Sequence, residues 1–320
     1  MRDYFFQQLI NGLNIGAIYA LIALGYTMVY GILRLINFAH GDVYMVGAFI
    51  GLGLSKLLGY STGSAGVAGY NAETAHTSLW GGFALVMIGS MIGAAILGMA
   101  IERFAYRPVR KYARMTTLIT AIGVSLLIEN LFVARLGSAQ QAFPAFVSKD
   151  NFTLFGTVQI SLPQIIIFVV SIALMLLLQW IIYRTKIGTA MRAVSFNLNS
   201  AKLMGINTNV VISFTFALGS ALAAAGGVLT TQFNSSIDPL MGIIFGLKAF
   251  VAAVLGGIGN IPGAVLGGLV IGVAETMVIA YGGSIGIESS YRDAVAFAIL
   301  ILVLLLRPSG LLGTTVQEKV

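Results

Sequence analysis

Six polar residues stand inside or at the edge of long apolar runs, where they could meet an ion or a polar solute. They are Asn37, His40, Asp42, Glu129, Lys248 and Glu275. A charged side chain at the centre of a bilayer costs about 2.5–3.5 kcal/mol on insertion scales, so charges there usually have a function. These residues are candidates for lining a translocation path or for gating. The alternative for each is a structural buried pair, or a side chain that reaches the membrane interface.

Four of these residues form two pairs, and the two pairs predict different structures. Lys248 and Glu275 lie on neighbouring apolar segments, so they can form either a structural ion pair or part of a path. Asp42 stands two residues from His40. We expect that pair to mark a break in a helix rather than a proton relay.

Signatures of an enzyme or a metal site are weak in this sequence. It has no cysteine and only two histidines, which is too few for a three-histidine zinc site. No Gly-Lys dipeptide occurs, so the chain has no phosphate-binding loop of the Walker A type. Gly59 to Gly63 fits the pattern G-x-S-x-G, but that motif needs a strand, a turn and a helix, and here it falls between apolar runs. We expect no catalytic residue, no metal and no cofactor.

A short polar segment, residues 186–205, separates two long apolar runs and is called the connector below. Ala193, Asn197 and Ala201 recur every four residues, which predicts one helix face, and Gly205 is suited to end that helix. A short polar helix held between two membrane spans can dock into a cleft of a soluble partner. The alternative is an ordinary basic interfacial helix, which should show a broader apolar face and more Lys and Arg.

The composition predicts the elements that hold these residues. Of 320 residues, 58% are hydrophobic and 9% are charged, whereas a soluble domain carries about 25% charged residues. Most of the 39 glycines lie inside apolar runs, as is common in membrane helices. The net charge of +7 comes from basic residues in a few short loops, so we expect no nucleic-acid partner. The chain is predicted to be an all-α, polytopic transmembrane bundle.

About 20 apolar residues are needed to cross the hydrocarbon layer. Runs of this kind occur at 9–30, 41–58, 83–101, 116–134, 161–183, 207–230, 243–281 (long enough for two crossings, with a break at Gly256 to Gly263) and 291–306. We therefore expect eight or nine crossings, with a re-entrant or broken helix near 31–42. The first run is too long for a cleaved signal, and residues 1–320 are predicted to form a single transmembrane domain.

Basic residues in short loops predict the orientation in the membrane. They crowd two loops: Arg103, Arg107, Arg110, Lys111 and Arg114 in one, and Arg184, Lys186, Arg192 and Lys202 in the other. Both loops should be cytoplasmic, which makes 136–160 and 59–78 external. Arg307 and Lys319 place the C-terminus inside, whereas the sequence does not place the N-terminus.

Small residues spaced four apart predict close helix packing, because they let backbones approach each other. The pairs are Gly12/Gly16, Gly47/Gly51, Gly89/Gly93, Gly263/Gly267 and Gly268/Gly272. Residues 41–53 and 242–257 share a small-residue texture, which is compatible with an inverted repeat but too loose to establish one.

Three motifs together carry a resemblance to a known family. They are Ile36-Asn37-Phe38-Ala39-His40-Gly41-Asp42, the connector with Gly188, Arg192-Ala193, Asn197, Ala201 and Gly205-Ile206-Asn207, and Lys248-Ala249-Phe250 with Gly256-Gly257-Ile258-Gly259 and Pro262-Gly263. The chain resembles the branched-chain amino-acid ABC transporter permeases, most closely the H-type subunit of the Liv system, from about Gln8 to Gly313.

The resemblance implies an importer in the bacterial inner membrane. An extracytoplasmic binding protein would deliver the amino acid. Two homologous permease chains, expected to form a heterodimer in membrane lipid, would form the path. Two ATPase subunits would drive transport. The family's coupling residues map onto Gly188, Ala190, Arg192, Ala193, Asn197, Ala201, Gly205 and Ile206. Many relatives carry an acidic residue where Asn197 stands, and the loop at 59–78 looks longer than usual.

Three other functions stay open from the sequence. Related permeases carry urea or short amides, although a path with few polar anchors fits leucine, isoleucine or valine. A channel or carrier that works without an ATPase would make the connector a mere interfacial helix. An intramembrane enzyme would need a constellation of residues that the sequence does not offer.

Overall fold

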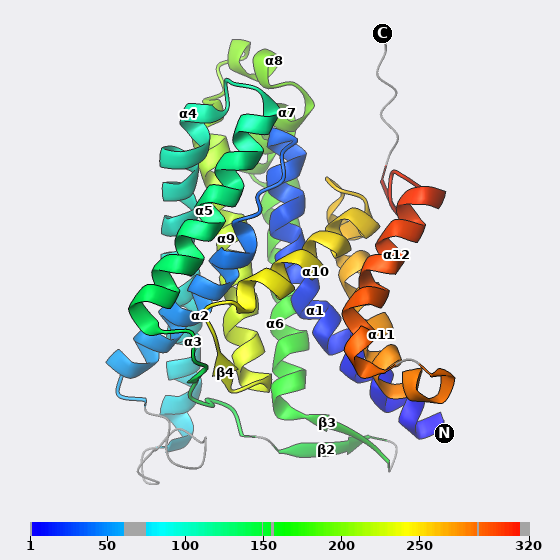
Figure 1. Ribbon diagram of the computed structural model, residues 1–320. Coiled ribbons are helices and arrows are strands. Elements are labelled where there is room, and N and C mark those ends of the chain that lie inside the picture. Colours follow the sequence, from blue (N-terminus) through cyan, green and yellow to red (C-terminus); the bar gives the residue numbers. More distant parts are fainter. Residues whose placement is uncertain (1, 61–74, 149, 155–156, 287, 314–320) are drawn as a thin grey trace.

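The chain forms an upright bundle of helices, as the sequence predicts (Figure 1). The computed structural model describes residues 2–60, 75–148, 150–154, 157–286 and 288–313. Within those residues, seven helical segments are long and apolar enough to cross a membrane. They are built on α1 (Arg2–Leu33), α3 (Ala75–Ile101), α5 (Arg114–Leu136), α6 (Leu162–Arg184), α9 (Thr208–Phe233), α11 (Ile261–Tyr281) and α12 (Arg292–Leu306).

Shorter elements complete the bundle. The π-helical segment η1 (Glu102–Tyr106) and α4 (Arg107–Val109) extend α3, and the 3-10 turns η2 (Gly282–Ile285) and η3 (Ser289–Tyr291) lead into α12. The connector holds α7 (Lys186–Phe196) and α8 (Leu198–Leu203). Two more helices, α2 (His40–Leu57) and α10 (Met241–Gly256), begin inside the bundle.

The helices α2 and α10 each complete a crossing of their own, and the first part of each crossing is a segment outside any helix. After α1 the chain returns into the bundle, and α2 starts with His40 against Ile22, near the middle of α1. After α9 the chain returns in the same way and α10 starts at Met241. The first turns of α2 and α10 meet, because a Cβ on Gly246 would lie 2.7 Å from the Cα of Gly41. With both counted, the described residues make nine crossings, and the predicted breaks near 31–42 and 256–263 are confirmed.

The two halves of the bundle form an inverted repeat. Each of α1, α2, α3 and α5 runs in the opposite direction to its counterpart in the second half, and these counterparts are α9, α10, α11 and α12, in that order (Figure 1). The helix α6 joins the two halves. Their packing is also matched, since α1 packs most extensively on α11 as α3 does on α9, and α2 contacts α3 as α10 contacts α11. The small-residue texture shared by 41–53 and 242–257 therefore belongs to equivalent helices of the two repeats.

Glycines set the closest helix contacts, as the four-residue spacing predicts. A Cβ on Gly12 would lie 2.7 Å from the Cα of Val273, and one on Gly16 would lie 2.7 Å from the Cα of Leu269. This contact joins the pair Gly12/Gly16 of α1 to the pair Gly268/Gly272 of α11. Because lipid tails give no hydrophobic drive for association, such backbone approach supplies the packing that holds the helices. The least buried long helices are α5 and α12.

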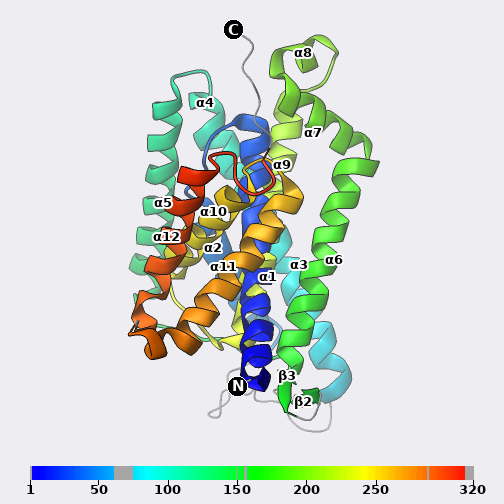
Figure 2. The same ribbon diagram turned by 90° about the vertical axis from the view of Figure 1, so that its right-hand side faces the viewer.

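One end of the bundle carries both basic loops, and the opposite end carries two small sheets (Figures 1 and 2). The antiparallel pairs are β1 (Gln141–Ala142) with β4 (Ser236–Ile237), and β2 (Asn151–Leu154) with β3 (Val158–Ser161). These strands were not predicted, since runs of two to four residues show no useful periodicity. The side chain of Gln7 donates a 2.8 Å hydrogen bond to the carbonyl of Gln159, so α1 begins at the sheet end.

Most of the predicted external loop at 59–78 cannot be compared with the structure. Residues 61–74 lie outside the described part of the chain, and so does the serine of the G-x-S-x-G match. The helix α3 already begins at Ala75, so the last residues of the predicted loop belong to a helix.

Candidate functional site

The connector turns sharply away from the membrane-length helix α6. Thr185 caps α7, and its Oγ1 accepts a 3.1 Å hydrogen bond from the backbone N–H of Gly188. A Cβ on Gly188 would lie 2.6 Å from the carbonyl carbon of Ile182, so the turn has no room for a side chain. Gly188 therefore permits α7 to leave α6 at this angle.

The connector is two helices rather than one, so the prediction of a single helix face through Ala193, Asn197 and Ala201 is wrong. Helix α7 ends at Phe196, and the side chain of Asn197 accepts hydrogen bonds from the backbone N–H groups of Asn199 (3.0 Å) and Ser200 (2.9 Å). An asparagine that caps a new helix competes with continuation of the old one. Aspartate caps a helix as well as asparagine does, so an acidic residue could take the place of Asn197 here.

The second short helix ends as the sequence predicts. Gly205 has a φ of +83°, and the N–H of Ile206 donates a 3.0 Å hydrogen bond to the carbonyl of Ala201. This is the usual left-handed helix ending that glycine allows. Asn207 then caps α9 through a 3.3 Å bond from the N–H of Val210, so the connector is tied at both ends.

The tip of the connector exposes apolar side chains. Phe196, Leu203 and Met204 are 90%, 88% and 82% exposed. Of the predicted coupling residues, Gly188 and Ala201 are buried, Ala190 and Ala193 are half-buried and Arg192 is exposed. These three apolar residues were not predicted from the sequence, although a large apolar residue beside a helix break is a signal that could have found them.

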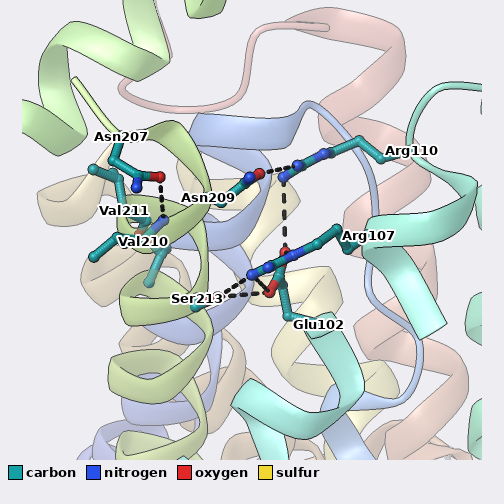
Figure 3. A network of polar contacts seen from close by, with 9 residues as sticks. Glu102, Arg107, Arg110, Asn207, Asn209, Val210, Val211 and Ser213 are labelled. Atoms are coloured by element: carbon teal, nitrogen blue, oxygen red, sulfur yellow. Dashed lines mark hydrogen bonds and ion pairs between the residues drawn. The ribbon is translucent and has the colours of Figure 1, made fainter. Parts of the chain in front are cut away.

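A polar cluster ties the other basic loop to the first turns of α9 (Figure 3). The carboxylate of Glu102, on η1, is buried and accepts hydrogen bonds from Arg107 at 2.7 Å and from Ser213 at 2.6 Å. Arg110 lies 3.7 Å from the same carboxylate and also donates to Asn209. We call Glu102, Arg107, Arg110, Asn209 and Ser213 the Glu102 clamp. Its two arginines belong to the basic loop predicted from the sequence, whereas Glu102 was not predicted.

Four predicted path residues gather where α2 begins. Asn37 accepts a 2.6 Å hydrogen bond from the hydroxyl of Tyr106, and His40 Nε2 donates to the carbonyl of Ile22 at 3.2 Å. Asp42 is buried in the first turn of α2, beside half-buried Glu129 of α5. Its Oδ2 has no hydrogen-bond partner among the described residues. The predicted helix break at His40 and Asp42 is confirmed.

The remaining two predicted residues form a separate cluster. The Nζ of Lys248 lies 3.1 Å from Glu275 Oε2 and 2.7 Å from Asp293 Oδ1, and the hydroxyl of Tyr19 donates to Glu275 at 2.9 Å. Lys248 and Glu275 are both buried, so the predicted ion pair exists. It joins α10, α11, α12 and α1, with Asp293 and Tyr19 as members that the sequence analysis did not find.

Comparison with known proteins gives the family. The family model described as the permease component of the branched-chain amino acid transport system matches residues 8–304. The chain belongs to this permease family.

The most similar curated permeases extend over the whole chain. The high-affinity branched-chain amino acid transport system permease protein LivH of Salmonella typhimurium is 44% identical over 99% of this chain and 98% of its own length. LivH of Escherichia coli K12 is 42% identical and BraD of Pseudomonas aeruginosa is 44% identical, each over 99% of this chain and 98% of its own length. As an ABC transporter permease, the chain is a multi-pass inner-membrane component that works with an ATPase and other subunits.

Proposed function

We propose that this chain is the H-type transmembrane subunit of an ABC importer for branched-chain amino acids. The observation that supports branched-chain amino acids as the cargo is the 42–44% identity, over nearly full length, to permeases named for that cargo. Urea or a short amide as cargo is not favoured by these relatives.

The connector is the place where an ATPase subunit docks. Its exposed tip residues Phe196, Leu203 and Met204 stand at the end of a polar segment, away from the body of the bundle. Large exposed apolar side chains on a polar segment favour a protein contact over open water. The tight turn at Gly188 and the caps at Asn197 and Gly205 would keep the connector stiff enough to transmit a push to α6 and α9.

The basic end of the bundle faces the cytoplasm. Both basic loops lie there, and basic residues in short loops mark the cytoplasmic side. The last described residues of α12 lie at the same end and α1 begins at the opposite end, which supports a cytoplasmic C-terminus and an external N-terminus. An extracytoplasmic amino-acid-binding protein would meet the end that carries the two sheets.

A second homologous permease chain completes the path, and one ATPase serves each permease. Glu129 is only half-buried on α5, a helix that the rest of the chain covers poorly. A carboxyl that faces lipid at this depth would be costly, so the partner permease should cover this face. Asn37, His40, Asp42 and Glu129 then border the path, while Lys248 and Glu275 hold α10 and α11 in place for gating.

Reconstitution of the complete transporter tests this function. Proteoliposomes would hold the chain with its second permease, the binding protein and the ATPases, and uptake of labelled leucine and labelled urea would be measured with and without ATP. We expect ATP-dependent leucine uptake that unlabelled valine and isoleucine suppress. Uptake of urea instead, or uptake of leucine at the same rate without the ATPases, would contradict it.

A further inference from the structure

A cavity of about 850 Å³ opens at the connector end of the bundle and belongs to neither cluster of path residues. It lies between the end of α1, the bend from α6 to α7, the turn from α10 to α11 and the end of α12. Apolar residues such as Met28, Ile182 and Leu304 line it, together with Arg34 and Arg192. The cavity is therefore amphipathic as well as basic.

The charge of the cavity is unbalanced. Among the described residues that line it, none is acidic, and within the described part of the chain neither Arg34 nor Arg192 makes an ion pair. Arg192 packs over the ring of Tyr183, 5.5 Å from its centroid. Two arginines without an acidic neighbour in the cavity wall favour an anionic occupant.

Arg34 occupies an unusual backbone position. Its φ is +51°, and within the described residues it is the one residue other than glycine with positive φ. It directly follows the end of α1, a place where glycine is common because a side chain there is strained by roughly 1–2 kcal/mol. A strained arginine whose side chain lines a cavity points to a role for that side chain.

We propose that this cavity binds the headgroup of an anionic phospholipid from the cytoplasmic leaflet. Arginine holds phosphate oxygens in paired, charge-assisted hydrogen bonds, and basic pockets between membrane helices are known to hold such headgroups. The acyl chains would cover the apolar wall beside Met28 and Ile182, which inorganic phosphate would leave empty. The site goes beyond cargo transport and depends only on the orientation of the bundle, so it can fail while the transport function holds.

The bound lipid would also act on the connector. Arg192 and Ser195 of α7 form part of the cavity wall, and α7 packs on α6 and on α1. A lipid that bridges Arg34 and Arg192 therefore ties the connector to the end of α1. Anionic lipid is expected to stabilise the transporter and to steady the face on which the ATPase docks.

Substitution of Arg34 gives a clean test, because glycine and asparagine both accept a positive φ. The purified transporter complex, carrying wild-type chain, Arg34→Gly or Arg34→Asn, would be placed in nanodiscs of phosphatidylcholine with or without phosphatidylglycerol. Lys111→Ala is the matched control, since it removes one exposed positive charge at the same end but outside the cavity. Thermal midpoints and the phosphatidylglycerol that co-purifies would be measured.

We expect phosphatidylglycerol to raise the midpoint of the wild type and of Lys111→Ala, but not of the two Arg34 variants. Retention of the lipid should fall roughly tenfold in those variants, the size expected for losing a charge-assisted contact. An equal response of Arg34→Gly and wild type, or no difference between the two lipids, would overturn the proposal. So would an equal rise with inorganic phosphate in detergent, because that would make the ligand a soluble anion.

Discussion

The hydroxyl of Ser213 donates a 2.6 Å hydrogen bond to the buried carboxylate of Glu102, which joins α9 to η1. The helix α9 follows the connector directly, and η1 is the π-helical end of α3. Short π-helical stretches occur often at functional sites. A push on the connector would therefore reach both repeats of the bundle through the Glu102 clamp.

Replacement of Glu102 should loosen this link. Glu102→Ala leaves Arg107 and Ser213 without their shared partner. We therefore expect the free energy of unfolding to fall by about 1.5–3 kcal/mol, the usual contribution of a hydrogen bond to a charged group. The thermal midpoint should fall, and fewer leucine molecules should enter per ATP hydrolysed. The exposed Arg103 serves as control through Arg103→Ala, which should change neither quantity. An unaltered ratio of uptake to hydrolysis in Glu102→Ala would show that the clamp transmits nothing.

The cap that Asn197 gives to α8 predicts a difference between two substitutions. Asn197→Asp keeps the cap of α8 and should transport normally, whereas Asn197→Ala should cost about 0.5–2 kcal/mol of local helix stability. Because α8 has only six residues, loss of its cap should unwind it and lower ATP-driven uptake. Asn199→Ala is the control, since Asn199 contributes its backbone N–H to this cap. Equal uptake by Asn197→Ala and Asn197→Asp would show that the Asn197 cap is not needed to couple ATP hydrolysis to transport.

The buried cluster around Lys248 predicts an order of stability. Lys248→Gln leaves the carboxylates of Glu275 and Asp293 near each other without their shared ammonium group. We expect the free energy of unfolding to fall by about 3–5 kcal/mol. Glu275→Gln should cost less, because Asp293 still lies 2.7 Å from the Lys248 ammonium. Thermal unfolding of the two single variants and the double variant would measure this, and the double variant should recover part of the loss. Greater damage from Glu275→Gln would mean that Asp293 does not neutralise Lys248.

The orientation can be measured with single cysteines, since the natural chain has none. Lys111→Cys and Phe196→Cys lie at the connector end, whereas Phe5→Cys and Phe152→Cys lie at the sheet end, and all four side chains are exposed. A reagent that cannot cross the membrane should label only the second pair in intact cells, and the first pair after lysis. External labelling of Lys111→Cys or Phe196→Cys would reverse the proposed topology.

Features that depend on local pattern or on an unavoidable physical cost could be predicted from the sequence. The glycine pairs of α1 and α11, the helix breaks and the ion pair of Lys248 with Glu275 are of this kind, because a buried charge needs a partner. Asp293 could not be assigned to that pair, since it stands at the edge of its apolar run and looks like an interface residue.

Features that depend on distant partners or on competing local bonds were missed. Glu102 adjoins a basic loop and meets Ser213, which is 111 residues away in the sequence. The small residues around Asn197 favoured one continuous helix, whereas the side chain of Asn197 makes better bonds as a cap. The short strands at the sheet end depend on pairing between segments as distant as Gln141 and Ile237.

The most direct test of the central claim, that the connector is where an ATPase drives this permease, is ATP-driven leucine uptake by a variant of its tip. Phe196→Asp with Leu203→Asp removes two of the three exposed apolar side chains of the tip, while Phe152→Asp makes a similar change on an exposed side chain at the opposite end. The tip variant should insert normally yet lose the co-purifying ATPase and at least about tenfold of its uptake, as expected for losing two apolar contacts. Phe152→Asp should keep both. Full uptake and a normal amount of bound ATPase in the tip variant would contradict the account.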